Sequence, residues 1–227
     1  MPSAGTSLPI TGGHGNSRVS KFKFEEFVSF DAAYTHVSGS QAKHDNSFTT
    51  LVTATIEGLN ILDVVTADRI VARLSSEHPP DHQEPHIVLL GSKFENLRIA
   101  GCPVDMELNH DLFLKLDTFE ALRKEFETAS EFRKMAEDPY QTGEKQKTPD
   151  THGVLLCSLV KSMKTDCPGV KRHGHVFIVP QFGKIFLGEV LAKRSSRTLT
   201  MLRLELGSPV TASAVGAQAV VNGETWP

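Results

Sequence analysis

The sequence lacks several features that would assign it to a protein class at once. Its 227 residues contain no run of about 18 apolar residues, so no transmembrane helix is expected. Lysine and arginine number 24 against 27 aspartates and glutamates, so the basic excess of a dedicated nucleic-acid binder is absent. Aromatic residues make up only 7%, too few for a base-stacking platform. We therefore expect neither a nucleic-acid partner nor insertion into a membrane.

Cysteine is also scarce. Cys102, Cys157 and Cys167 stand far apart and form no CxxC pair. An odd number of separated cysteines argues against a disulfide framework and against a zinc ribbon. The N-terminal stretch, residues 1–20, has no basic region followed by an apolar region, so it does not match a secretory signal. These absences predict a soluble protein of the reducing cytoplasm.

The residues that are present predict a mainly β fold. Residues 52–57, 104–108 and 198–206 alternate between apolar and polar side chains, as strands with one buried face do. Residues 176–179 and 185–187 are apolar on both faces, which predicts central strands. Residues 64–74 also suit a helix face, but their β-branched side chains favour a strand. About nine or ten short strands predict an antiparallel β-sandwich or barrel.

One segment differs in kind and predicts a single inserted amphipathic helix over residues 117–137. Its apolar residues recur at spacings of three and four, which places them on one face of a helix. Asp117 with Glu120 resembles a capping box at the start, and Pro139 follows the end.

The chain divides into three parts by composition. Residues 1–19 are rich in glycine, serine and proline and predict a flexible tail. Residues 20–207 form the expected single β-rich domain. Residues 208–227 form a C-terminal extension of small side chains, whose valines can dock as an extended edge strand. A short internal echo, EGLNI at 57–61 and ENLRI at 95–99, hints at a duplication.

The histidines carry the main chemical signal. His173 and His175 are two residues apart, which predicts that both imidazoles project from the same face of a strand. Many metal-dependent β-barrel enzymes present two ligands in this way, with a third converging from elsewhere. His82 and Glu189 are the candidates for that position, so these four residues are the predicted ligands of a divalent metal.

Two alternatives to the metal site stay open. His82 belongs to the segment HPPDHQEPH, residues 78–86, whose prolines exclude a helix and favour a solvated polar loop. His173 and His175 are then ordinary residues beside a turn. Glu189, flanked by apolar residues, becomes the best general acid or base if it faces into a barrel.

Two segments resemble a known group of proteins. Thr53–His78 contains a strand with a GL-x-I element followed by TAD, and Gly91–Val104 contains L-x-I-x-G-x-P-V. Both patterns are similar to bacterial β-rich surface proteins of the choice-of-anchor type. The resemblance implies an extracellular structural module, and the inserted helix is not part of its pattern.

No coherent catalytic motif is present. Ser158 and Lys161 match S-x-x-K by letter, but a strand places them on opposite faces. Two function classes therefore remain. The first is a non-enzymatic interaction or structural module that binds a protein partner or self-associates through strand edges. The second is a metal-dependent or ligand-binding β-barrel protein that uses the His-x-His pair.

Overall fold

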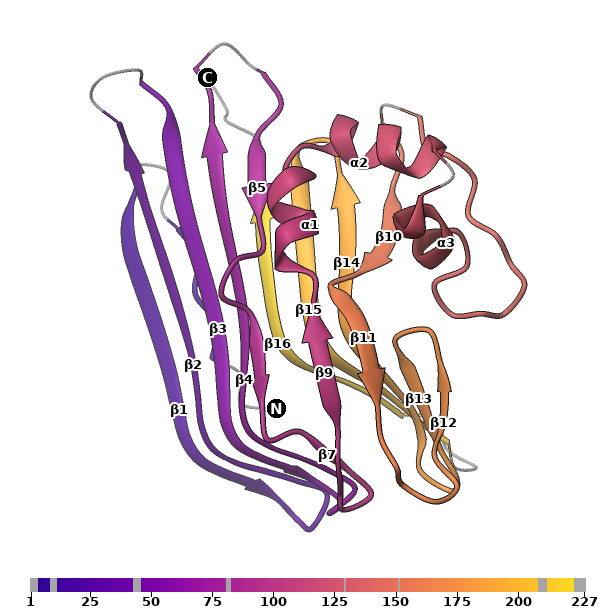
Figure 1. Cartoon of the computed structure of the whole chain (residues 1–227). Helices are drawn as coiled ribbons and strands as arrows, with labels where there is room; N and C mark the ends of the chain where they lie inside the picture. Colours follow the sequence, from indigo (N-terminus) through magenta and orange to yellow (C-terminus); the bar gives the residue numbers. More distant parts are fainter. Residues whose placement is uncertain are drawn as a thin grey trace.

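The fold is seen in a computed structural model that describes residues 4–8, 12–42, 46–80, 83–128, 130–150, 152–207 and 212–222. Two large antiparallel sheets face each other, and short helices gather at one end (Figure 1). The mainly β prediction is confirmed. Of the two predicted architectures, the described strands form open sheets and not a closed barrel.

The first sheet contains the longest strands of the molecule. They are β1 (Gly13–Phe24), β2 (Val28–Gln41), β3 (Phe48–Ile61), β4 (Val65–His78), β5 (His86–Val88), β6 (Lys93–Glu95), β7 (Arg98–Ile99) and β8 (Cys102–Pro103). Their order in space is β1-β2-β3-β4-β7-β8, and β5 and β6 also pair with β4. Residues 64–74, which also suited a helix, lie almost wholly in β4 and confirm the strand interpretation.

The second sheet is built from the C-terminal part of the chain. Its strands are β10 (Leu155–Ser158), β12 (Lys171–His173), β13 (Val176–Val179), β14 (Gly183–Lys193), β15 (Ser196–Leu206) and β16 (Ala212–Asn222). They lie in the order β12-β13-β14-β15-β16, with β10 paired to β14. A separate pair joins β9 (Asp105–Leu108) to β11 (Val160–Lys164).

The core lies between the two sheets, where β16 packs across β3 and β4. Ile56 and Ile70 are partners in register and both are buried. Their neighbours Glu57 and Arg69 project from the opposite face and form an ion pair of 2.5 Å. This alternation is the one that the sequence pattern predicts.

The predicted single helix over 117–137 is wrong in its continuity. The structure has α2 (Phe119–Glu127) and α3 (Glu131–Glu137), preceded by α1 (His110–Lys115). Thr128 takes an extended backbone conformation, and the Ser130 hydroxyl accepts a hydrogen bond of 3.2 Å from the Arg133 amide. A hydroxyl that caps a new helix competes with continuing the old one, which explains the break. Among the described residues, no helix is long and apolar enough to cross a membrane.

Both sheets bend at residues in the left-handed backbone region. Lys21 (φ 53°) and Gly58 (φ 61°) occupy β1 and β3, while Gly188 (φ 63°) and Ala217 (φ 52°) occupy β14 and β16. The regular strand pairing is interrupted at each of these four positions. Such irregularities bend a strand and raise its twist, and Figure 1 shows the long strands curving near the loops at its lower end.

The structured domain extends beyond both predicted boundaries. β1 begins at Gly13, inside the expected tail of residues 1–19, and β16 lies inside the expected extension of residues 208–227. Backbone pairing with β2 and β15 supplies the hydrogen bonds, so small polar side chains suffice. The edge position of β16 confirms the docked edge strand expected in this extension. At the other end of the chain, Leu8 packs so closely on Gly39 that a side chain at position 39 would collide with it.

A disulfide joins Cys102 of β8 to Cys167, which overturns the expectation that the cysteines stay unpaired. The two residues are 65 positions apart in the sequence, but their Cα atoms are 5.5 Å apart. Only the fold brings them together, so spacing alone could not reveal the pair. Cys157 is free and buried, as expected of a small core residue.

Candidate functional site

A buried carboxylate lies at the centre of the most concentrated polar cluster. Glu189 of β14 and Arg203 of β15 project from the face of the second sheet opposite the core. Arg203 Nε lies 2.6 Å from Glu189 Oε2, and Nη2 lies 2.9 Å from Oε1. The Tyr140 hydroxyl donates a further hydrogen bond of 2.8 Å to Oε1. Tyr140 follows α3, so the cluster fastens the helical segment to the second sheet.

Aromatic packing closes the cluster. The guanidinium carbon of Arg203 lies 3.5 Å from the centre of the Phe186 ring, a cation–π contact. Tyr140 meets the same ring edge-on at 5.5 Å between centroids. The charges are therefore held between an aromatic ring and the sheet, where water screens them little.

The environment shifts the ionisation of these groups. Burial by itself would raise the pKa of Glu189, but the contacts with Arg203, His175 and Tyr140 outweigh it and lower the pKa to about 2. Burial raises the pKa of Tyr140, and the bond to Glu189 raises it further. The bond to Glu189 also raises the pKa of Arg203. The site consequently holds an ionised carboxylate, a neutral phenol and a charged guanidinium.

The structure separates the two histidines of the predicted pair. His173 ends β12 and is paired with Val176 of β13, so Gly174 and His175 form the turn between them. Gly174 has φ 57°, a conformation that suits the first position of a two-residue hairpin turn. The prediction that both imidazoles share a strand face is therefore wrong, because a turn and not a strand carries His175.

His175 and Glu189 do come together. The His175 side chain is 3% exposed, and its Nε2 lies 3.7 Å from Glu189 Oε1. That distance is too long for a hydrogen bond, and Nε2 has no hydrogen-bond partner. His173 instead lines a separate cavity of about 320 Å³ on the other side of Tyr140.

The predicted metal site is not assembled by the described residues. No group of three histidine, cysteine, aspartate or glutamate side chains in this part of the chain could hold a metal ion. His82 lies outside the described residues. Arg203 already neutralises Glu189, and its positive charge would repel a cation at the same carboxylate.

The rest of the histidine-rich segment binds the helices. The Glu84 carboxylate accepts a hydrogen bond of 2.7 Å from the Phe119 amide at the start of α2. His86 Nδ1 lies 2.7 Å from Asp117 Oδ2. His78 is buried and bonded to Ser76 at 2.9 Å, and burial lowers its pKa. A carboxylate at a helix N-terminus is stabilising, so part of this segment acts as a cap.

The S-x-x-K interpretation is excluded by geometry. Ser158 is buried in β10, where its hydroxyl bonds the backbone carbonyls of Leu187 and Gly188. Lys161 lies in β11 and pairs with Glu107 at 2.6 Å. The two side chains serve different elements, so the lysine does not activate the hydroxyl.

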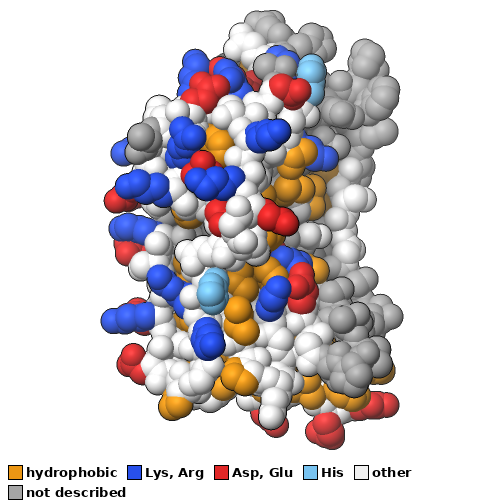
Figure 2. Space-filling model, turned by 90° about the vertical axis from the view of Figure 1, so that its right-hand side faces the viewer, with side chains coloured by type: hydrophobic (Ala, Val, Ile, Leu, Met, Phe, Trp, Pro, Cys, Tyr) orange, Lys and Arg blue, Asp and Glu red, His pale blue; other side chains and the backbone are white. Residues whose placement is uncertain are grey.

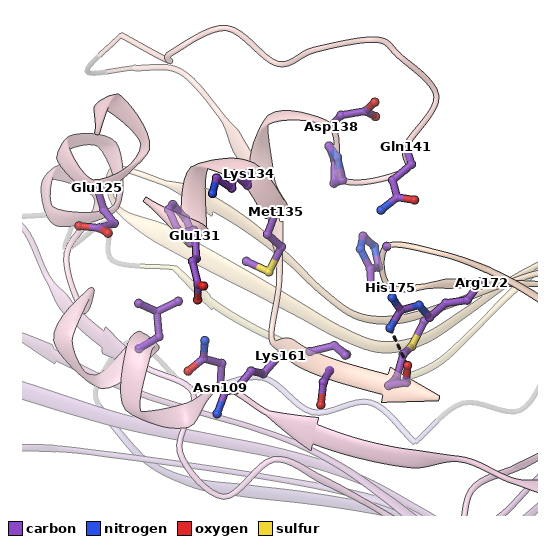
Figure 3. A pocket seen from close by; sticks show the side chains of 17 residues that line it. Asn109, Glu125, Glu131, Lys134, Met135, Asp138, Gln141, Lys161, Arg172 and His175 are labelled. Atoms are coloured by element: carbon purple, nitrogen blue, oxygen red, sulfur yellow. Dashed lines mark hydrogen bonds between the residues drawn. The ribbon is translucent and has the colours of Figure 1, made fainter. Parts of the chain in front are cut away.

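A cavity of about 340 Å³ lies between the helices, β11 and the turn after β12. Figure 3 shows Arg172 and His175 on one side of it and Glu125 and Glu131 on the other. Sequence reasoning missed most of these residues. The helical ones lie off the apolar stripe, where charged side chains usually mark a solvated face.

The first sheet has a free edge at β1. In the described part of the chain β1 pairs only with β2, so its outer backbone groups meet no other strand. Residues of β1 are exposed or half-buried along the whole strand. Long unpaired edges of this kind are sites for strand addition.

Charge is spread over the helical side of the molecule. In Figure 2, basic and acidic side chains are interspersed over the face that includes the helices, and apolar side chains show between them. The basic side chains visible there do not form a stripe, which agrees with the near-balance of charge in the sequence.

Comparison with known proteins gives a family but no function. No curated protein and no solved structure matches the chain. A family model described as a domain of unknown function matches residues 1–193, from the N-terminus to the end of β14. Because this match covers most of the sequence, the chain belongs to the family described as domain of unknown function DUF8256.

Proposed function

We propose that the protein is a non-enzymatic β-rich interaction module that self-associates by pairing β1 with β1 of a second copy. The observation that carries the proposal is the free outer edge of β1, a strand of 12 residues. A second copy is the favoured occupant because a self-complementary arrangement exists for this strand. Such two-fold contacts are the commonest form of self-association.

The bend at Lys21 limits the pairing segment to residues 13–20. This straight stretch, GHGNSRVS, has small or polar side chains apart from Val19 and a single formal charge, at Arg18. Lys21 and Lys23 follow it, and lysines on an edge discourage pairing. The outer edge of residues 13–20 is therefore open to a partner, and residues 21–24 are protected.

A two-fold axis through Ser17 gives a register without opposed like charges. Antiparallel pairing about that axis places Arg18 opposite Asn16 of the second copy and His14 opposite Ser20. Residues that face each other share a side of the sheet, so the polar face stays polar across the interface. The two first sheets then join into one continuous sheet.

The test is the oligomeric state of the full chain by sedimentation velocity over a range of concentrations. We expect a reversible dimer in the wild type. Asn16→Lys places a lysine opposite Arg18 at two equivalent positions, so it should weaken the dimer by about tenfold or more. A wild type that stays monomeric at every concentration would overturn the proposal.

Two control variants distinguish repulsion at the β1 edge from a general effect of added charge and from the loss of the Asn16 side chain. Ser40→Lys adds the same charge to an exposed position of β2, away from the edge, and should leave the dimer intact. Asn16→Ala removes the 2.7 Å contact with His36 without adding charge and should also leave it intact. Equal weakening by Ser40→Lys would show that net charge, not edge pairing, controls association.

The disulfide bears on the compartment. Disulfides persist in oxidising surroundings and are rare in the reducing cytoplasm. The pair Cys102–Cys167 supports an extracellular or otherwise oxidising location, the alternative implied by the resemblance to surface proteins, over the cytoplasm. A structural module that self-associates outside the cytoplasm combines both proposals.

A further inference from the structure

The cavity beside α3 has the size of a small-molecule site and is partly open to solvent. Its volume of about 340 Å³ is at the lower end of the range for ligand pockets. It is lined by residues of α1, α2, α3 and the segment after it, β11, β12 and the turn after β12. The three helices and β11 all lie between Cys102 and Cys167, so the disulfide closes the base of the segment that forms most of the cavity.

One side of the cavity carries cationic and hydrogen-bonding groups. Arg172 donates from Nη1 to the Met163 carbonyl at 2.7 Å, which positions the guanidinium and leaves further N–H groups to donate. Lys134 of α3 has no ion-pair partner in the described chain, but Figure 3 shows its side chain beside Glu131, on the other side of the cavity. His175 lines the same cavity, and its buried Nε2 makes no hydrogen bond but faces the Glu189 carboxylate at 3.7 Å.

The other side of the cavity carries unpaired carboxylates. No ion pair within the described residues engages the Glu131 or Glu125 side chains, although Lys134 is on the same helix as Glu131. Two other charged lining residues are already committed. Asp138 accepts hydrogen bonds from the Thr142 and Gly143 amides, and Lys161 binds Glu107.

We propose that this cavity binds a small zwitterionic organic molecule, whose carboxylate is bound by Arg172 beside His175 and whose ammonium group faces Glu131. Charges of both signs line one cavity without pairing to each other, and a ligand that carries both signs satisfies each side. Figure 3 shows Glu131 on the opposite side of the cavity from Arg172 and His175, as such a ligand requires. Charge-assisted hydrogen bonds to both ends are the strongest contacts available.

The test compares three probes of matched carbon chain with the full-length protein. They are 4-aminobutyrate, which carries both charges, butyrate, which carries only the anion, and butylamine, which carries only the cation. Binding is followed by titration calorimetry and by the NMR resonances of the His175 imidazole. We expect 4-aminobutyrate to bind about tenfold more tightly than either single-charge probe and to shift the His175 resonances.

Two variants and their controls locate the charges. Arg172→Gln should weaken 4-aminobutyrate and butyrate but not butylamine, and Glu131→Gln should weaken 4-aminobutyrate and butylamine but not butyrate. Lys124→Gln and Glu144→Gln remove charges from exposed positions that do not line the cavity, and neither should change binding.

Two outcomes would overturn the site. The first is that no probe shifts the His175 resonances. The second is that the control variants weaken binding as much as Arg172→Gln and Glu131→Gln. Neither readout depends on self-association, so this site and the β1 interface fail or stand separately.

Discussion

Arg203 holds both carboxylate oxygens of Glu189, and the two residues lie on neighbouring strands that are not opposite each other in register. Glu189 is partnered with Thr200, while Arg203 is partnered with Phe186. The ion pair therefore reaches diagonally past the irregularity at Gly188. It joins the two straight portions of the second sheet where their pairing is interrupted.

Removing one member of this pair should destabilise the fold strongly. Arg203→Met leaves a mostly buried carboxylate without its counterion, at a cost on the order of 3 kcal/mol in the free energy of unfolding. Urea denaturation measures the loss. The double variant Glu189→Gln, Arg203→Met removes both charges and should recover part of it, whereas equal losses in both variants would contradict a paired charge.

Stability should fall in acid because Glu189 becomes protonated. Its folded pKa of about 2 lies below the ordinary value of 4.5, so the ionised form is bound more favourably in the folded state. The contribution to stability is fully present above pH 4.5 and is lost as the pH falls towards 2. Urea midpoints of the wild type and of Glu189→Gln should converge over that window. A constant difference between the two urea midpoints over this pH range would contradict the lowered pKa of Glu189.

Breaking the disulfide should lower stability by about 4 kcal/mol, the chain-entropy value for a loop of this length. Thermal unfolding with and without a reducing agent measures the effect in the wild type. The double variant Cys102→Ser, Cys167→Ser should unfold at the same temperature as the reduced wild type, whether or not the reducing agent is present. Finding all the cysteines as free thiols in the denatured, unreduced protein would show that the bond is absent.

Gly58→Ala should destabilise the first sheet by about 2 kcal/mol or more. Gly58 has positive φ, and a side chain there would collide with the Asp31 carboxylate. Gly101→Ala is the matched control, because Gly101 also has positive φ but a methyl group there would meet no other atom within 4 Å. It should cost about 1 kcal/mol. Equal midpoints in chemical denaturation would show that the Asp31 contact carries no cost.

Much of the fold could be predicted because hydrophobic periodicity reports local burial directly. The alternation in residues 52–57 and 198–206 identified parts of β3 and β15. The helix break at Thr128 could not be predicted from the apolar stripe, which continues through it. Residues 13–19 of β1 were assigned to the tail because their pairing with β2 depends on backbone groups, which leave little trace in side-chain identity.

The candidate site was predictable only in part. Glu189 was singled out as a charge within an apolar strand, and it does lie at the centre of the polar cluster. His175 was chosen for its spacing from His173, but its position follows from the turn at Gly174. Tyr140 and Arg203 carried no sequence signal, because their partners are 49 and 14 residues away from them and only the fold brings them together.

The internal echo has a structural counterpart that its five letters alone did not prove. EGLNI at 57–61 and ENLRI at 95–99 flank β4 on opposite sides in the same register. The first residue of each copy is opposite Arg69, and the last is opposite Val65. The two similar segments therefore pair with β4 in equivalent positions, one on each side, which favours the duplication that the sequence indicates.

The disulfide also determines how the molecule would respond to mechanical load. A pulling force transmitted along the backbone passes from Cys102 to Cys167 through the sulfur atoms and bypasses the 65-residue separation between them. All three helices and most of the cavity lie in that bypassed segment. A stretched, oxidised molecule would be roughly 220 Å shorter than a reduced one, because the residues between the two cysteines would not be extended.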